Sequence, residues 1–195
     1  MAYSKVSAAA SEALSKKLNY SEEKQQILAY GMEKLIFTSL GFLLIMLMAW
    51  LLDVEKEALA AVAAGATLRK FSGGFHRDTA LGCLISSVAF YSAAAILAYY
   101  GFALFGQIAW FFILFIGMII LIIVGYYAPV DSPHKPIVST EFKQRLKFIS
   151  MFVVLFFVMA ALVFANSSVG NAFLAGLCLQ TITILPILNK RRCSP

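Results

Sequence analysis

The amino-acid sequence predicts an all-α, polytopic integral membrane protein with about six transmembrane helices, one of them short or re-entrant. Of its 195 residues, 61% are hydrophobic and only 13% are charged, whereas an average soluble domain has about 25% charged residues. The mean hydropathy is +0.83. Because so few polar residues could cover a water-facing surface, the composition excludes an ordinary soluble enzyme, a disordered tail and a disulfide-stapled secreted module.

The predicted spans follow the long apolar runs of the sequence, which together make one transmembrane domain over residues 35–188. Five runs are long enough to cross an apolar bilayer core of about 30 Å: residues 35–52, 81–105, 108–127, 148–165 and 169–188. A sixth run, residues 58–68, would be only about 17 Å long as a helix. It therefore either crosses a locally thinned bilayer or forms a re-entrant hairpin.

Polar segments flank this domain at both ends. Residues 1–34 carry many charges and loosely recurring apolar positions, which predict one or two cytoplasmic or interfacial amphipathic helices. Ser21, followed by Glu22 and Glu23, is typical of a helix start with acids in the first turn. Residues 189–195 form a basic tail that we expect on the cytoplasmic side.

The distribution of basic residues predicts the orientation in the membrane. The chain has 16 Lys and Arg and a net charge of +6. If all six runs cross, Lys56 alone falls on one side and the other basic residues fall on the opposite side, which the positive-inside rule makes cytoplasmic. If run 58–68 does not cross, this asymmetry largely vanishes, so the charges favour crossing. The basic excess indicates contact with anionic lipid headgroups, and no nucleic acid partner is expected.

The segment Arg69–Cys83 combines a helix break with residues suited to chemistry. Two adjacent glycines, Gly73 and Gly74, would cost a helix about 2 kcal/mol and therefore predict an interruption. Asp78 or Thr79 can cap the helix that follows.

Cys83 would then lie near the positive end of that helix, where basic neighbours and the helix dipole favour the thiolate over the thiol. Arg69, Lys70 and Arg77 supply the basic neighbours. His76 could exchange a proton with Cys83 only if it lies in the bent segment, because on one continuous helix they would be about 10.5 Å apart along the axis. The alternative is a cysteine that only packs and a histidine that only lies at the interface.

A second unusual segment, residues 126–137, contains three prolines that end the preceding span and stiffen a loop. Asp131, His134 and Lys135 could bind a charged part of a substrate, although a rigid connector explains the pattern equally well. His134 is the only histidine besides His76, so metal ligands are too few, and neither a metal nor another cofactor is expected.

Together these two segments resemble the accessory gene regulator B (AgrB) family of bacterial membrane-embedded cysteine endopeptidases, which process quorum-sensing peptide precursors. The resemblance rests on Arg69, Gly74, and the pair His76 and Cys83 seven residues apart, followed by the loop Tyr127–Pro136. Chain length, polar N-terminal helices and the layout of the spans also agree, so the resemblance covers nearly the whole chain.

The resemblance implies that His76 is the general base, or the imidazolium partner of a resting thiolate, and that Cys83 is the nucleophile of a thiol protease. Cys83 would attack the C-terminal boundary of the signal segment in an AgrD-like precursor and form a thioester. A Cys or Ser of the substrate would then close an autoinducing thiolactone or lactone ring. The substrate-binding candidates are Arg69, Lys70, Gly74, Asp131 and Lys135. The resemblance is also compatible with a homodimer.

Two non-enzymatic interpretations remain open at this stage: a membrane carrier or exporter of a peptide, and a membrane scaffold. The interiors of the predicted spans contain cysteine and tyrosine as their only ionisable residues. Transport paths usually carry buried acids or arginines, so this pattern weakens the carrier interpretation.

Four further residues have expected structural roles. Cys178 is expected in the core, Glu57 in solvent, and Gly117 and Gly176 at close contacts between helices.

Overall fold

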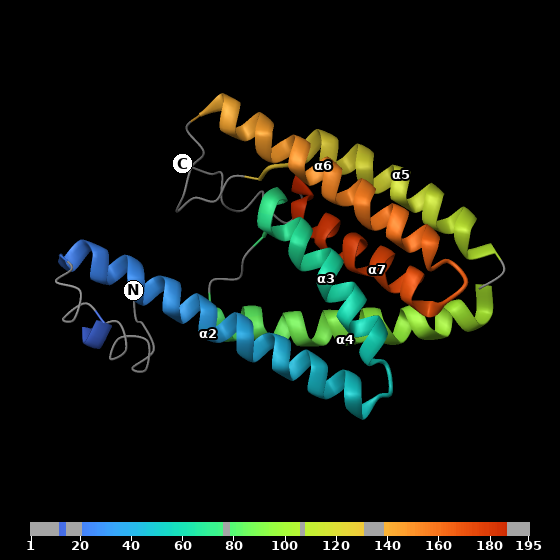
Figure 1. The fold of residues 1–195 in the computed structure, drawn as a ribbon, viewed down its shortest axis with the longest axis horizontal. Coiled ribbons are helices and arrows are strands. Elements are labelled where there is room, and N and C mark those ends of the chain that lie inside the picture. Colours follow the sequence, from blue (N-terminus) through green and yellow to red (C-terminus); the bar gives the residue numbers. More distant parts are fainter. Residues whose placement is uncertain (1–11, 15–20, 76–78, 106–107, 131–138, 187–195) are drawn as a thin grey trace.

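The structure is a computed structural model that describes residues 12–14, 21–75, 79–105, 108–130 and 139–186. These residues contain six long helices and no named strand, as the sequence predicts. The helices are α2 (Glu22–Leu51), α3 (Glu55–Ser72), α4 (Ala80–Phe105), α5 (Ala109–Tyr127), α6 (Thr140–Val163) and α7 (Ser168–Ile184). They run alternately from one end of the bundle to the other (Figure 1).

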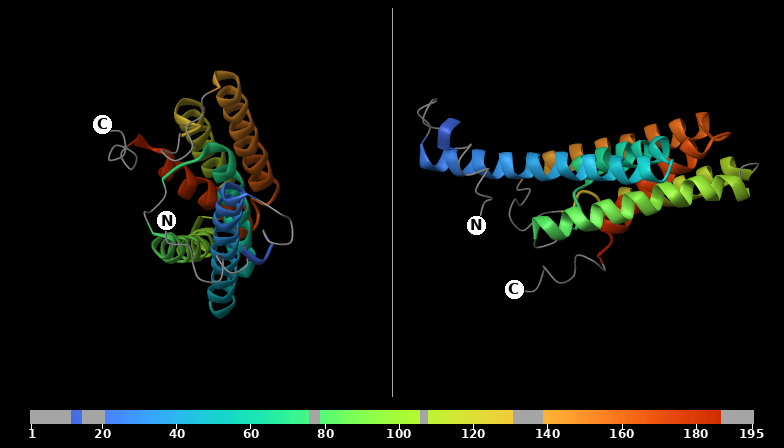
Figure 2. Two further views of the ribbon diagram at one scale, coloured as in Figure 1. Left: turned by 90° about the vertical axis from the view of Figure 1, so that its left-hand side faces the viewer. Right: turned by 90° about the horizontal axis from the view of Figure 1, so that it is seen from below.

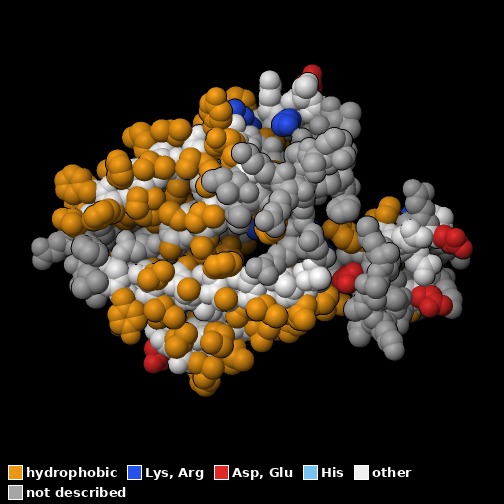
Figure 3. All heavy atoms as spheres, turned by 180° about the vertical axis from the view of Figure 1, so that it is seen from behind, with side chains coloured by type: hydrophobic (Ala, Val, Ile, Leu, Met, Phe, Trp, Pro, Cys, Tyr) orange, Lys and Arg blue, Asp and Glu red, His pale blue; other side chains and the backbone are white. Residues whose placement is uncertain are grey.

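Four helices contain segments that are long and apolar enough to cross a membrane: Lys24–Leu51, Leu81–Phe102, Trp110–Tyr127 and Thr140–Val163. The helix Ser168–Ile184 is a shorter apolar helix. Hydrophobic side chains are spread over much of the described part of the face seen in Figure 3, and the few acidic and basic side chains visible there lie mainly along its edges. Large apolar side chains such as Leu35, Phe115 and Phe152 are exposed. This surface is suited to lipid, and the protein is a multi-pass membrane protein.

The helix α3 is longer than run 58–68, from which it was predicted. Its 18 residues correspond to about 27 Å, and it is one continuous helix without a reversal. It lies parallel to α7 from one end to the other: Glu57 contacts Ser168, Gly65 meets Gly176, and Arg69 bonds to Gln180. Packing against α7 explains how α3 occupies the interior although it is not among the four most apolar segments.

Small residues allow α3 and α7 to approach closely. A Cβ at Gly65 would lie 2.9 Å from the carbonyl oxygen of Gly176, and a Cβ at Gly176 would collide with the carbonyl oxygen of Ala61. Gly117 makes a similar contact elsewhere, since a Cβ there would lie 2.9 Å from Val158. The predicted packing role of Gly117 and Gly176 is thus confirmed; small residues commonly mediate such backbone approach between membrane helices.

The first long helix begins earlier than the predicted span 35–52. From Glu22 onward, the segment predicted to be interfacial is continuous with the first span, because no proline interrupts the helix between Glu22 and Leu51. Ser21 occupies the N-cap position, as the sequence predicts, although its side chain makes no capping hydrogen bond. The N-terminal part of α2 extends beyond the other helices (Figures 1 and 2).

The helix α6 also begins before its predicted span 148–165. Ser139 caps it by accepting a hydrogen bond from the Phe142 N–H at 3.4 Å. Three basic residues between the predicted spans 108–127 and 148–165 therefore lie on the first turns of a helix: Lys143, Arg145 and Lys147.

The prediction that Glu57 is solvated is wrong. Its side chain is only 6% exposed and accepts a hydrogen bond from the Ser168 hydroxyl. The parallel packing brings the first turn of α7 beside the first turns of α3, so the serine replaces water as a partner for the carboxylate. A buried acid needs such a partner to offset the loss of hydration.

If the backbone contact between α3 and α7 sets the packing of the bundle, Gly176→Ala will lower the unfolding temperature of the purified protein in lipid nanodiscs. Its methyl group must displace the backbone of Ala61, and such overpacking costs about 1–3 kcal/mol. The matched control is Gly101→Ala in α4, where a Cβ meets nothing within 4 Å. Equal unfolding temperatures for the two variants would contradict the packing argument.

Candidate functional site

The segment that carries the predicted chemistry begins where α3 ends. Gly73 and Gly74 follow Ser72 with φ values of +67° and +132°, in a region of backbone conformation that favours glycine. The chain leaves the helix at this point, and the break predicted from the two adjacent glycines is confirmed.

The loop after α5 packs directly against this break. The backbone N–H of Val130 donates to the carbonyl oxygen of Ser72 at 2.9 Å, and Gly73 pairs with Val130 in an isolated parallel β-bridge. A Cβ on Gly73 would lie 2.5 Å from the Val130 carbonyl oxygen, so the approach requires glycine. The structure therefore brings the segment Arg69–Cys83 into contact with the start of the loop Tyr127–Pro136. The resemblance to the family rested on these two segments.

On its other side the break is held by Gln180 of α7. The Gln180 Nε2 donates to the carbonyl oxygen of Gly73 at 2.7 Å and to the Ser72 Oγ at 3.1 Å. Its Oε1 accepts from the Arg69 Nη1 at 3.3 Å. The Gln180 side chain is only 2% exposed, so these partners replace water around a buried amide.

The residues that follow the break are held by their backbone groups. Arg69 donates from Nη2 to the carbonyl oxygen of Phe75 at 2.6 Å, and the N–H of Phe75 donates to the carbonyl oxygen of Thr183 at 2.9 Å. A Cβ on Gly74 would lie 2.5 Å from the Thr183 Oγ1. The loop Gly73–Phe75 is therefore attached to α3, to α7 and to the segment after α5.

Sequence analysis missed Gln180 and Thr183 as parts of this site. A signal was present, because both are polar residues near the end of the apolar run 169–188. Polar side chains in a membrane segment usually face a protein partner rather than lipid.

The helix α4 begins with a capped first turn that contains the cysteine. The Thr79 Oγ1 accepts from the N–H of Gly82 at 3.1 Å, and the Thr79 carbonyl oxygen accepts from the N–H of Cys83 at 3.0 Å. Of the two predicted caps, Thr79 is thus the one the structure supports. Cys83 is half-buried at the positive end of the helix dipole, as predicted.

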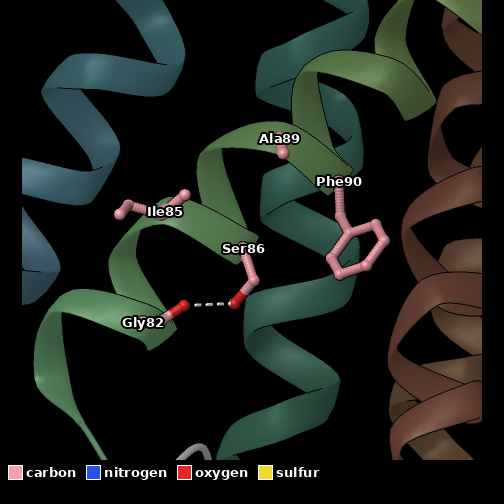
Figure 4. Close-up of a pocket in the computed structure, with 5 residues that line it drawn as sticks. All are labelled: Gly82, Ile85, Ser86, Ala89 and Phe90. Atoms are coloured by element: carbon pink, nitrogen blue, oxygen red, sulfur yellow. Dashed lines mark hydrogen bonds between the residues drawn. The ribbon is translucent and has the colours of Figure 1, made fainter.

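A shallow, mainly apolar depression of about 270 Å³ lies on α4 beside this turn. Its lining residues are Gly82, Ile85, Ser86, Ala89 and Phe90 (Figure 4). Ser86 donates from Oγ to the carbonyl oxygens of Gly82 at 2.7 Å and Cys83 at 3.1 Å, so its hydroxyl is bonded within the helix.

The other predicted site residues differ in what the structure says of them. Lys70 is exposed at the end of α3, whereas Arg69 is half-buried and bonds to Gln180 and Phe75. Cys178 is half-buried and packs against the core, as expected. Six predicted residues lie outside the described part of the chain: His76, Arg77, Asp78, Asp131, His134 and Lys135.

Residues 7–184 match the family model for accessory gene regulator B. The chain belongs to the accessory gene regulator B family. Among its AgrB-like relatives, a putative AgrB-like protein of Clostridium perfringens (strain SM101 / Type A) is 32% identical over 141 residues, which cover 70% of this chain and 65% of the relative. The accessory gene regulator protein B of Staphylococcus lugdunensis is 27% identical over 124 residues, which cover 64% of this chain and 62% of that protein.

A putative AgrB-like protein of Halalkalibacterium halodurans matches over a longer region, 174 residues at 27% identity, which cover 88% of this chain and 82% of the relative. The Clostridium perfringens and Staphylococcus relatives are matched over a little under two thirds of their own length. No solved structure matches this AgrB family member.

Gly73→Ala will destabilise this AgrB family member by about 1–3 kcal/mol, because alanine at positive φ is strained and its methyl group meets the Val130 carbonyl oxygen. Thermal unfolding in nanodiscs measures the effect. Gly125→Ala is the control close to the same loop, because its Cβ would make only ordinary contacts with Met151 at 3.7 Å and beyond. If Gly73→Ala is as stable as Gly125→Ala, the close approach of the Val130 carbonyl oxygen to Gly73 is contradicted.

Proposed function

We propose that the protein is a membrane cysteine endopeptidase of the bacterial plasma membrane that acts in quorum sensing. Its substrate is an AgrD-like signal-peptide precursor, which it cleaves at the C-terminal side of the signal segment through an acyl-enzyme on Cys83. Membership of the accessory gene regulator B family supports the system in which it acts. The chemistry of the described residues supports the reaction type.

The observation that carries the proposal is the position of Cys83 relative to the loop Gly73–Phe75. Cys83 lies in the capped first turn of α4, and only residues 76–79 join the loop to that helix. His76 follows Phe75 directly, before α4 begins. The helix that carries Cys83 begins at Ala80, so one helix running from position 76 to Cys83, which would prevent proton transfer between the two residues, is not formed.

In the proposed reaction the Cys83 thiolate attacks the scissile carbonyl carbon. A C–S bond forms, the C–N bond breaks, and the leaving amine takes a proton from the His76 imidazolium. A Cys or Ser side chain of the signal segment then attacks the thioester, transfers its proton to neutral His76, and releases the Cys83 thiolate. The product is a thiolactone or lactone, and low water content at the membrane boundary favours this ring closure over hydrolysis.

The proposed site faces the cytoplasm. Among the described basic residues, Lys56 alone lies at the end where α2 passes into α3; the others lie on the N-terminal half of α2, at the end of α3 or at the start of α6. Apart from Lys56, these residues gather at the opposite end of the bundle, where α4 begins with Cys83. The positive-inside rule assigns this basic end to the cytoplasmic side. An acidic precursor tail would be attracted there, with Lys70 as the exposed candidate contact and Arg69 and Lys135 as further candidates. Gly74 and Asp131 are proposed to contact other parts of the substrate.

Cys83→Ala and His76→Ala will abolish cleavage when the chain is co-expressed with a candidate AgrD-like precursor, because each removes one of the two groups that move protons or form the thioester. Mass spectrometry of the precursor and its fragments measures the result. Cys178→Ala is the matched control, because Cys178 packs against the core within α7, and this variant is expected to cleave normally.

Membrane fractions must contain equal amounts of each variant. Full processing by Cys83→Ala would refute the peptidase and favour a carrier or exporter of the peptide instead.

If Cys83 rests as a thiolate, iodoacetamide will alkylate it faster than Cys178 at neutral pH in folded, nanodisc-embedded protein. Thiolates are the reactive form, and the two cysteines differ in their helix position: one lies in the first turn of α4 and the other inside α7. Peptide mapping after timed quenching measures both rates in one sample. A Cys83 rate equal to or below that of Cys178 would contradict a resting thiolate.

A further inference from the structure

We infer that Gln180 is a positioning residue of the proposed peptidase. Its side-chain amide holds the loop Gly73–Phe75 and thereby fixes the point from which the chain continues to His76. This inference rests on the proposed function. It adds to the site a residue from α7, more than 90 positions along the chain from Cys83.

The orientation of the Gln180 amide is determined by its partners. Its Nε2 faces the Gly73 carbonyl oxygen at 2.7 Å and its Oε1 faces the Arg69 guanidinium at 3.3 Å. A flipped amide would direct its N–H groups at the guanidinium, donor against donor, and its oxygen at the carbonyl oxygen. Since the side chain is 2% exposed, no bulk water could relieve that mismatch, and the observed orientation is strongly favoured.

The guanidinium of Arg69 extends this attachment one step along the loop. It donates from Nη1 to Gln180 and from Nη2 to the Phe75 carbonyl oxygen at 2.6 Å. The planar guanidinium thus holds an α7 side chain and a loop carbonyl group at a fixed separation. Phe75 is bound through both backbone groups, because its N–H also reaches the Thr183 carbonyl oxygen.

The helix that carries Gln180 is itself fixed against α3. Backbone contact at Gly65 and Gly176 sets the distance between the helices, and Gln180 follows Gly176 by about one turn. Gly74 fits against this helix, since a Cβ there would lie 3.2 Å from the Gln180 Nε2. Removing the amide therefore releases the loop from α7 at Gly73 while leaving the backbone contact between α3 and α7 intact.

The test compares Gln180→Met with Thr181→Val in nanodiscs, using a synthetic AgrD-like precursor. Methionine has nearly the length of glutamine but no amide, so we expect kcat to fall about 10- to 100-fold through misplaced geometry, with KM within about two-fold of wild type. Alkylation of Cys83 by iodoacetamide is expected to slow as well. Thr181 is 4% exposed, and its hydroxyl bonds only within α7, to Leu177 at 2.8 Å; its variant should retain wild-type values.

A kcat for Gln180→Met within two-fold of that of Thr181→Val would overturn the inference. If Gln180→Met does not fold, Gln180→Glu decides: it keeps an acceptor for Arg69 but loses the amide donor to Gly73, so a reduced kcat supports the inference and an unchanged kcat overturns it. Cys83→Ala in the same assay separates the two proposals. If Cys83→Ala still cleaves, the peptidase itself is refuted; if only Gln180→Met is normal, the positioning role alone fails.

Discussion

The contact between the backbones of α3 and α7 fixes the register of the two helices, and the polar contacts of the candidate site depend on that register. Gly176 admits the carbonyl oxygen of Ala61, and Gly65 lies against the carbonyl oxygen of Gly176. At this separation, polar side chains near both ends of the two helices come within hydrogen-bond distance of each other. Glu57 meets Ser168 at one end, and Arg69 meets Gln180 at the other. In a low-dielectric interior such bonds are strong, and unpaired groups are costly, so the pair has one favoured register.

The register of α3 on α7 also determines which groups hold the loop Gly73–Phe75 that follows α3. Glycines give the backbone conformations that other residues avoid, and neighbouring elements then supply a partner for each exposed backbone group. Val130 comes from the segment after α5, Gln180 and Thr183 come from α7, and Arg69 comes from the preceding helix. The result is a loop fixed as far as Phe75, the residue before His76 in the sequence, and a capped helical turn that contains Cys83. Fixed support of this kind is what the nucleophile and base of the proposed peptidase would require.

Local features of the sequence predicted several parts of this arrangement correctly. Two adjacent glycines predicted the end of α3, and a hydroxyl residue predicted the cap of α4, because both effects act over one helical turn. The ends of helices without such signals were predicted less well. The helices α2 and α6 begin well before their apolar runs, since charged residues such as Lys143 and Arg145 are good helix formers, and apolarity marks membrane depth rather than helix length.

By itself, then, the sequence determined that this protein is built for a lipid environment, because its composition carries that information. It also supplied the charges and the residue spacing on which the proposed orientation and the proposed chemistry rest. Only the tertiary structure decided that Glu57 is buried and that Gln180 reaches the glycine loop. It also showed that the segments before α4 and after α5 meet at Gly73 and Val130. These facts depend on which helices lie side by side at backbone contact, and that choice is made by complementary surfaces more than 50 residues apart in the chain, which no local pattern encodes.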